Sequence, residues 1–168
     1  MTFAGSPGGT QSVRVRSERA RSIVDAWRER VAAGPNRAAI RYFDGTVDAA
    51  TLDAHSDTLA AELQARGVRP DDRIGIHLQN IPYYPLTLLA VWKAGAIAVP
   101  LNPMYRGEEL RRLVEDSGTT GIVVARGTDE ATRSALSGTR VRWLLSASSR
   151  DFQTRNDSRM FSGPDAAP

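Results

Sequence analysis

The sequence predicts an α/β protein with a partial, doubly wound and mainly parallel sheet that has helices on both faces. Short apolar segments of strand length alternate with longer segments in which apolar residues recur at helical spacing. Gly, Pro and Asp residues separate these segments and leave little room for long loops. Such alternation favours strand–helix–strand units, and their right-handed crossovers place the helices against the sheet.

A helix and a hairpin are expected at the start of the folded region. The helix covers residues 19–33. Its apolar stripe consists of Ile23, Val24, Trp27 and Val31. Residues 38–43 then form a short strand, and Asp44-Gly45 predicts a hairpin turn before a brief second strand that includes Val47.

A second helix follows the hairpin. Asp48 is its expected N-cap, because a carboxylate can accept a hydrogen bond from the free backbone N–H groups of the first turn. The helix is expected to run to about Arg66, with Gly67 just beyond it in the left-handed conformation that ends many helices. The buried stripe of this helix consists of Leu52, Leu59, Ala60 and Leu63.

The main sheet is expected from the remaining elements. Strands are expected at residues 73–78, 96–99, 122–125 and 141–145, and helices at residues 82–94, 108–117 and 129–136. Pro85 fits the helix that starts at Pro82 only if it lies in the first turn, where its missing N–H has no partner to lose. The strand at 96–99 is wholly apolar, which predicts cover on both faces. Thr128 is the expected cap of the last helix.

Length and composition predict one globular domain of a soluble, cytoplasmic protein. The chain has 168 residues, of which 41% are hydrophobic and 24% charged, and no apolar run reaches the ~20 residues of a membrane span. It has no cysteine, so disulfides and cysteine-based metal sites are excluded. We expect residues 1–18 to be a flexible leader without a secretory signal, residues 19–146 to be the domain, and residues 147–168 to be an irregular polar tail.

The charge pattern gives no reason to expect a nucleic-acid partner. The net charge is +3, from 21 arginines, one lysine (Lys93) and 19 acidic residues. Six arginines lie within residues 14–30, where a nucleic-acid arm is one interpretation. Glu18, Asp25 and Glu29 interrupt this run, which favours a solvated helix face instead.

The loop Ser117-Gly118-Thr119-Thr120-Gly121 is the motif that most resembles a phosphate-binding site. Glycine-rich loops with hydroxyl side chains bind phosphate through backbone amides. Here the loop follows a helix and leads into the strand at 122–125, and no lysine follows it. We therefore expect a helix C-terminal turn, with Gly118 as its left-handed residue.

No catalytic, cofactor-binding or metal-ligating residue is assigned from the sequence. The two histidines, His55 and His77, have no second histidine or carboxylate at metal or triad spacing, so we expect a surface or a hydrogen-bonded core role. Three tryptophans occupy apolar positions, where core packing is more common than lining a ligand pocket: Trp27, Trp92 and Trp143. The acidic pairs are typical of helix ends and turns: Asp71-Asp72, Glu108-Glu109 and Glu115-Asp116.

The order of several short motifs between residues 38 and 160 resembles the adenylate-forming (AMP-binding) acyl-CoA synthetases. The matching segments are Leu52-Asp53 with Ser56, Gly67-Val68, Asp72-Arg73-Ile74, Asn80-Ile81-Pro82, Ala90 to Ala96 (AVWKAGA) and Val99 to Pro103 (VPLNP). Residues 102–110 (NPMYRGEEL) are most similar to the long-chain fatty-acid–CoA ligase branch. The resemblance implies the N-terminal α/β subdomain of these ligases.

The same resemblance implies a reaction, and it also implies that residues 1–168 lack some of the family's motifs for that reaction. In that family, ATP and a carboxylic acid form an acyl adenylate, and CoA then displaces AMP; ATP, Mg and CoA are the implied cofactors and a fatty acid the implied substrate. The family's phosphate loop, with its Pro-Lys, and its C-terminal domain have no counterpart in residues 1–168. We therefore expect a truncated N-terminal fragment that binds none of these cofactors and is inactive alone. The alternatives are one component of a split ligase, with the missing remainder as its partner, and a non-catalytic binding or regulatory module.

Overall fold

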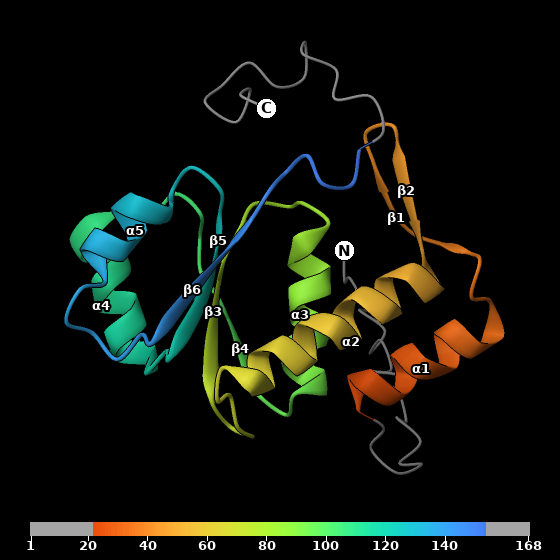
Figure 1. Ribbon diagram of the computed structural model, residues 1–168, viewed down its shortest axis with the longest axis horizontal. Coiled ribbons are helices and arrows are strands. Elements are labelled where there is room, and N and C mark those ends of the chain that lie inside the picture. Colours follow the sequence, from red (N-terminus) through yellow and green to blue (C-terminus); the bar gives the residue numbers. More distant parts are fainter. Residues whose placement is uncertain (1–21, 154–168) are drawn as a thin grey trace, which may run out of the picture.

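The computed structural model describes residues 22–153, which form a four-stranded sheet between two pairs of helices, with a helix and a hairpin at one side (Figure 1). The helices are α1 (Ile23–Ala33), α2 (Ala49–Ala65), α3 (Tyr83–Lys93), α4 (Gly107–Ser117) and α5 (Asp129–Ala135). The strands are β1 (Ala38–Tyr42), β2 (Gly45–Asp48), β3 (Arg73–His77), β4 (Ile97–Pro100), β5 (Gly121–Ala125) and β6 (Trp143–Ala147). The residues expected as a leader, 1–18, lie outside the described part, as do residues 19–21 of the first expected helix.

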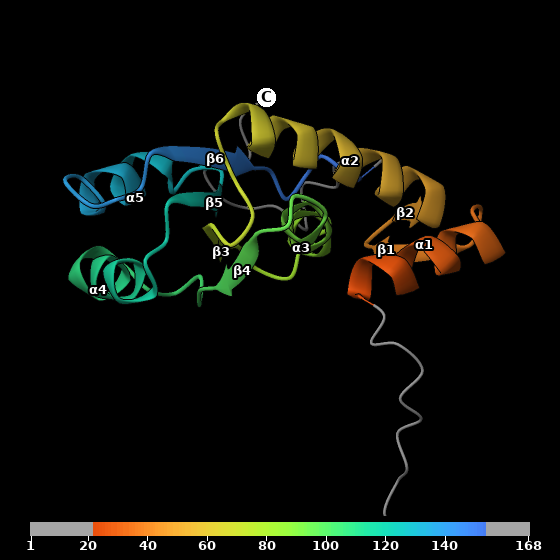
Figure 2. The same cartoon turned by 90° about the horizontal axis from the view of Figure 1, so that it is seen from below.

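The main sheet is parallel and doubly wound, as predicted. Its strand order is β4-β3-β5-β6, and every neighbouring pair is parallel. The chain therefore steps outward from β3 to β4, crosses back to β5 and continues to β6. Helices α2 and α3 cover one face and α4 and α5 the other (Figure 2). Each face has its own core: Ile74, Ile76 and Leu63 belong to the first, and Leu110 and Ile122 to the second.

Local signals in the sequence end the helices where the structure ends them. The side chain of Asp48 accepts a hydrogen bond from the backbone N–H of Thr51 at 2.7 Å, so it caps α2 as predicted. Gly67 has a φ of +84°, which confirms it as the left-handed residue beyond α2. Pro85 is the third residue of α3, within the first turn, and so removes no helical hydrogen bond.

Of two local predictions, one was wrong and one was right only in part. The hairpin turn consists of Phe43 and Asp44, because Tyr42 pairs with Gly45 across the two strands, and Phe43 adopts a φ of +50°. Thr128 stands at the predicted N-cap position of α5, but its side chain makes no capping bond; its hydroxyl donates to the carbonyl of Ala125 at 2.8 Å and closes the preceding turn instead. For Thr128, the hydroxyl had a second local partner that spacing alone does not reveal.

The prediction that the apolar strand near residue 97 is covered on both faces was right only in part, since Ala98 and Val99 pack against opposite cores but are only partly buried. Within the described residues β4 pairs with β3 alone and forms an edge of the sheet, and Ile97 is 41% exposed. An apolar sequence indicates a strand of this sheet but does not show whether that strand lies at the edge or in the interior of the sheet. The last strand also differs: β6 spans Trp143–Ala147, two residues further along than the expected 141–145.

The segment after β6 folds back across the helices. Phe152 packs edge-on against Tyr83, with ring centroids 5.1 Å apart, and the Tyr83 hydroxyl donates to Asp151 at 2.9 Å. The chain then passes so close to the hairpin that a Cβ on Gly45 would lie 1.9 Å from the Phe152 carbonyl oxygen. This contact joins the hairpin to the end of the described chain.

Candidate functional site

The loop at residues 117–121 is a helix end, as the sequence predicted. Gly118 has a φ of +67°, and its N–H donates to Glu115, while the N–H of Thr119 donates to Val114, each at 3.0 Å. The next amide, Thr120, donates to the Arg73 carbonyl at 2.8 Å. These three amides are all used inside the fold, so they are not free to bind a phosphate group.

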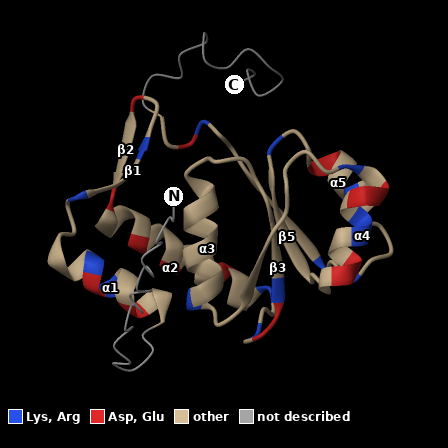
Figure 3. Ribbon diagram, turned by 180° about the vertical axis from the view of Figure 1, so that it is seen from behind, with Lys and Arg blue, Asp and Glu red and all other residues tan. Residues whose placement is uncertain are grey.

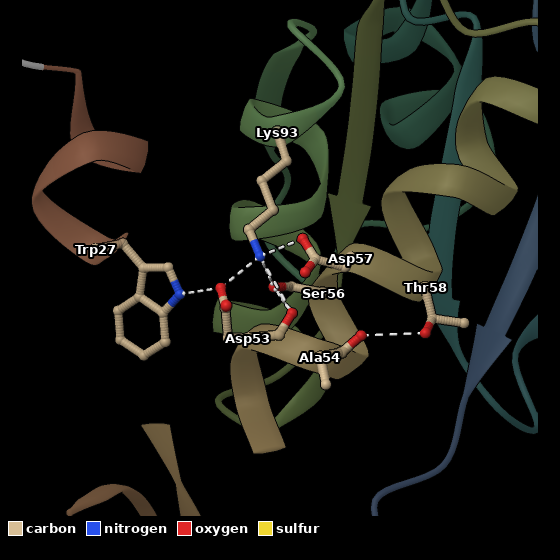
Figure 4. Close-up of polar contacts among 7 residues, drawn as sticks. All are labelled: Trp27, Asp53, Ala54, Ser56, Asp57, Thr58 and Lys93. Atoms are coloured by element: carbon tan, nitrogen blue, oxygen red, sulfur yellow. Dashed lines mark hydrogen bonds and ion pairs between the residues drawn. The ribbon is translucent and has the colours of Figure 1, made fainter. Parts of the chain in front are cut away.

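The most highly connected polar cluster of the described chain is centred on Lys93, at the C-terminal end of α3 (Figure 4). Its ammonium group donates to the Asp53 carboxylate at 2.6 Å and the Asp57 carboxylate at 2.7 Å. It also donates to the Ser56 hydroxyl at 2.8 Å and the Asp53 carbonyl at 3.1 Å. The Lys93 side chain is only 6% exposed. Four acceptors surround three donors, so the cation is fully hydrogen-bonded.

Trp27 joins α1 to the same cluster. Its indole N–H donates to the Asp53 carboxylate at 2.8 Å, so one carboxylate links three helices. Burial acts to raise the pKa of Asp53, but the hydrogen bonds from Lys93 and Trp27 and the lysine charge outweigh it and hold the pKa below its usual value. The Asp53 carboxylate is therefore ionised at pH 7. The Lys93 Nζ is occupied by hydrogen bonds to two carboxylates, a hydroxyl and a carbonyl, an arrangement that suits holding helices together.

Sequence reasoning did not find this cluster. The helical spacing places Lys93 on the apolar stripe of its helix, and Asp53 and Ser56 enter only through their resemblance to a family motif. One signal was present: the sole lysine of the chain stands on an otherwise apolar helix face. A charge in such a position needs a partner, because an unpaired buried charge is very costly.

His77 lies at the carboxyl end of β3, beside the point where the chain connections of the sheet reverse direction. Open parallel sheets bind ligands most often at such a point. His77 is 2% exposed, and neither ring nitrogen has a hydrogen-bond partner of standard geometry among the described residues. Burial lowers the pKa of His77, and the charge of Arg106 lowers it further. Contacts with the backbone of Tyr105 and Asn102 act to raise this pKa, but their effect is weaker. His77 is therefore a core histidine, as predicted, but it lacks a hydrogen-bond partner of standard geometry among the described residues.

An open groove of about 670 Å³ lies between α2, the start of α3 and the segment after β6. Its lining residues include Leu59, Ala65, Leu86, Phe152, His55 and Tyr83, with Glu62 and Asp151 as the charged groups. No arginine or lysine of the described chain lines it, so nothing there offsets the negative charge of a phosphate or a carboxylate. His55, on the exposed face of α2, borders this groove.

The three tryptophans do not form one cluster. Trp27 and Trp92 line a second, apolar cavity of about 450 Å³ between α1, β1 and α3. Trp143 lies in the main core, with its ring directly over Gly121. Within residues 22–153 no group of three or more His, Asp or Glu side chains could hold a metal ion. The described residues therefore do not fit ATP with Mg: the amides at 118–120 are already used, and the only lysine is paired.

Comparison with known proteins identifies the family. The AMP-binding enzyme family matches residues 27–162. The chain is 34% identical over 111 residues to one of the plipastatin synthase proteins of Bacillus subtilis, covering 66% of this chain and 4% of that protein. It is 31% identical over 111 residues to a long-chain-fatty-acid–CoA ligase of Escherichia coli, covering 66% of this chain and 20% of that protein.

Solved structures show the same fold. A long-chain-fatty-acid–CoA ligase from Archaeoglobus fulgidus superposes with a TM-score of 0.67 at 23% identity, covering 74% of this chain and 27% of that chain. The N-terminal domain of FACL13 from Mycobacterium tuberculosis superposes with a TM-score of 0.70 at 21% identity, covering 76% of this chain and 34% of that chain. The chain thus spans a fifth or less of these curated relatives and matches the N-terminal α/β subdomain of adenylate-forming enzymes. With the family matched over most of its length and the sheet order observed, this chain belongs to the AMP-binding enzymes.

Proposed function

We propose that this chain forms the N-terminal α/β portion of an adenylate-forming ligase of the acyl-CoA synthetase kind and does not carry out the ligase reaction alone. That reaction uses ATP to form an acyl adenylate and then transfers the acyl group to CoA. The proposal rests on one observation: the backbone amides and the lysine that could bind phosphate already have hydrogen-bond partners inside the fold. Three successive amides of the 118–120 loop are hydrogen-bonded internally, and the sole lysine is held by two carboxylates.

The proposed substrate is a fatty acid. Residues 102–110 resemble the long-chain branch, and the relatives include a long-chain-fatty-acid–CoA ligase. A second candidate is the adenylation module of a peptide synthetase, which the slightly higher identity of 34% to a plipastatin synthase protein favours. In either case the phosphate-binding and adenylate-forming groups come from polypeptide outside the described residues. The missing remainder is the proposed partner, and the cytoplasm the proposed location; among the described residues no helix is long and apolar enough to cross a membrane.

ATP–pyrophosphate exchange tests this proposal. The isolated chain is assayed with a series of fatty acids and, separately, with the proteinogenic amino acids, and an intact long-chain ligase serves as the positive control. We expect no exchange above the buffer value in either series, because electrostatic stabilisation of the transferring group is absent. Robust exchange by the isolated chain would overturn the proposal.

A second arm separates the two substrate classes. The chain is co-expressed with the polypeptide encoded directly downstream, and the purified complex is assayed in the same two series. Exchange with fatty acids supports the acyl-CoA ligase assignment, whereas exchange with amino acids alone supports the peptide-synthetase module. A complex that forms but is active with neither series would favour a non-catalytic binding or regulatory role.

A further inference from the structure

Helix α1 leaves part of its apolar surface uncovered. None of its 11 residues is buried, and Trp27 and Val31 on its apolar stripe are only half-buried. The hydrogen bond from the Trp27 indole to Asp53 ties the helix to α2 (Figure 4). Helices of soluble domains normally bury their apolar stripe against a neighbouring element. The uncovered part of α1 instead faces a space that the described residues do not fill.

That space is the cavity of about 450 Å³ between α1, β1 and α3. Leu52 and Leu89, which are 3% and 6% exposed, close it on the side of the core. Trp27 and Trp92 also line it, and β1 contributes Ala39, whose small side chain leaves room. Packed interiors hold few voids larger than a water molecule, whereas this volume lies within the range of small-molecule sites. The cavity is therefore large enough for an organic ligand with an apolar body.

Arg30 is the one charged residue among those that line this cavity in the described part of the chain. One nitrogen of its guanidinium donates to the Gly34 carbonyl at 3.2 Å. Among residues 22–153, no carboxylate forms an ion pair with Arg30, whereas Arg28 on the same helix is paired with Asp25. An arginine without a carboxylate partner therefore stands beside an apolar cavity, and the cavity has no acidic group of its own.

We propose that this cavity binds an aliphatic carboxylate, with the apolar chain between Trp27 and Trp92 and the carboxylate on Arg30. The inference goes beyond the proposed ligase role and does not rest on it. It uses only residues of α1, β1, α2 and α3, all of which lie within the described chain.

The chemistry of the lining selects this class of ligand. A planar guanidinium binds a carboxylate through two parallel hydrogen bonds, which fixes the head group as well as its charge. The indole N–H of Trp27 is already used by Asp53, so the head group is held by Arg30 alone. Burial of the aliphatic chain against leucine and tryptophan side chains supplies the rest of the affinity. An amine of the same length would meet the arginine with a like charge.

Three ligands of equal chain length test the head group by isothermal titration calorimetry on the full chain: decanoate, decanol and decylamine. Decanoate is expected to bind about tenfold more tightly than decanol, and decylamine more weakly than either. Arg30→Met is expected to raise the dissociation constant of decanoate about tenfold and to leave that of decanol unchanged. The matched control is Arg28→Met, which removes an exposed arginine of the same helix that does not line the cavity and leaves both constants unchanged.

Two further variants test the position of the chain, with circular dichroism confirming that each is folded. Ala39→Leu narrows the cavity and is expected to weaken decanoate and decanol alike. Bromine at the end of the chain quenches the fluorescence of a tryptophan that it contacts, so 10-bromodecanoate is expected to quench the wild type, and Trp92→Phe to reduce the quenched part.

Four results would overturn the proposal. They are an absence of decanoate binding by the full chain, binding of decanol or decylamine as tight as that of decanoate, equal weakening by Arg28→Met and Arg30→Met, and quenching that Trp92→Phe leaves unchanged. The last result would place the ligand elsewhere, since Trp143 lies in the main core.

Discussion

Replacing Lys93 with methionine is the most informative single change to the fold. Methionine keeps the length and apolar stem of the side chain but removes the charge that Asp53 and Asp57 share. Asp57 is 64% exposed and can turn to water, whereas Asp53 is 26% exposed and keeps the Trp27 indole as its hydrogen-bond donor. The substitution therefore leaves Asp53, a largely buried carboxylate, without its cationic partner.

The cost follows from that carboxylate. Breaking a fully buried ion pair from one side costs about 3–5 kcal/mol, and the partial exposure of Asp53 reduces this, so we expect Lys93→Met to lower the free energy of unfolding by about 2–3 kcal/mol. Urea denaturation at pH 7, followed by circular dichroism, measures the change. Adding Asp53→Asn is expected to recover about 1 kcal/mol or more, because an amide is cheaper to bury than an unpaired carboxylate.

The matched control is the exposed ion pair between Arg66 and Glu62, whose nitrogen and oxygen atoms are 2.7 Å apart. Arg66→Met removes the same kind of charge from the surface and is expected to cost less than about 1 kcal/mol. The reasoning is refuted if Lys93→Met unfolds within about 0.5 kcal/mol of the wild type, or if the two variants are equally destabilised.

Three further predictions concern His77, Gly121 and Tyr83. Burial lowers the pKa of His77 below its unfolded value, so the unfolded state binds the proton more tightly. The free energy of unfolding therefore decreases as the pH falls below about 6.5. In urea titrations between pH 7 and 5.5, His77→Leu is expected to remove this pH dependence. An unchanged slope in the variant contradicts this. Gly121→Ala is expected to cost about 2 kcal/mol or more, since the new Cβ would lie 2.1 Å from ring atoms of Trp143; a melting temperature equal to that of the wild type refutes the close approach. Burial and the hydrogen bond to Asp151 raise the pKa of Tyr83 to about 12. In an absorbance titration of the four tyrosines, one is therefore expected to ionise near that pH, and Tyr83→Phe is expected to remove that step. Ionisation of all four tyrosines near pH 10 would contradict this prediction. Because that pKa is raised on folding, its contribution to stability is lost as the pH rises from about 10 towards 12.

Charged residues of both signs occur along the helices, including α4 and α5, and the strands of the main sheet carry few (Figure 3). The buried charged cluster around Lys93 joins three helices. Family membership therefore rests on residues that shape the subdomain, and the chemistry of the family is proposed to lie elsewhere in the polypeptide.

The local predictions that succeeded depend on contacts close in the sequence. Asp48 caps α2, Gly118 ends α4 and Pro85 fits the first turn of α3, because each of these roles involves backbone groups within a few residues. The failures involve a choice between partners. Thr128 bonds to the preceding turn instead of the helix, and Phe43 takes the left-handed position that a Gly would have been expected to take.

By itself, the sequence determined the alternation of strands and helices, the parallel class of the sheet and the resemblance to the acyl-CoA synthetases, since periodicity and short motifs are properties of neighbouring residues. Tertiary structure alone decided which described strands lie at the edges, that Lys93 meets Asp53 from another helix, and that His77 is buried with no hydrogen-bond partner of standard geometry among the described residues. These features join residues tens of positions apart, and their energies depend on burial and distance. A linear pattern does not encode either quantity.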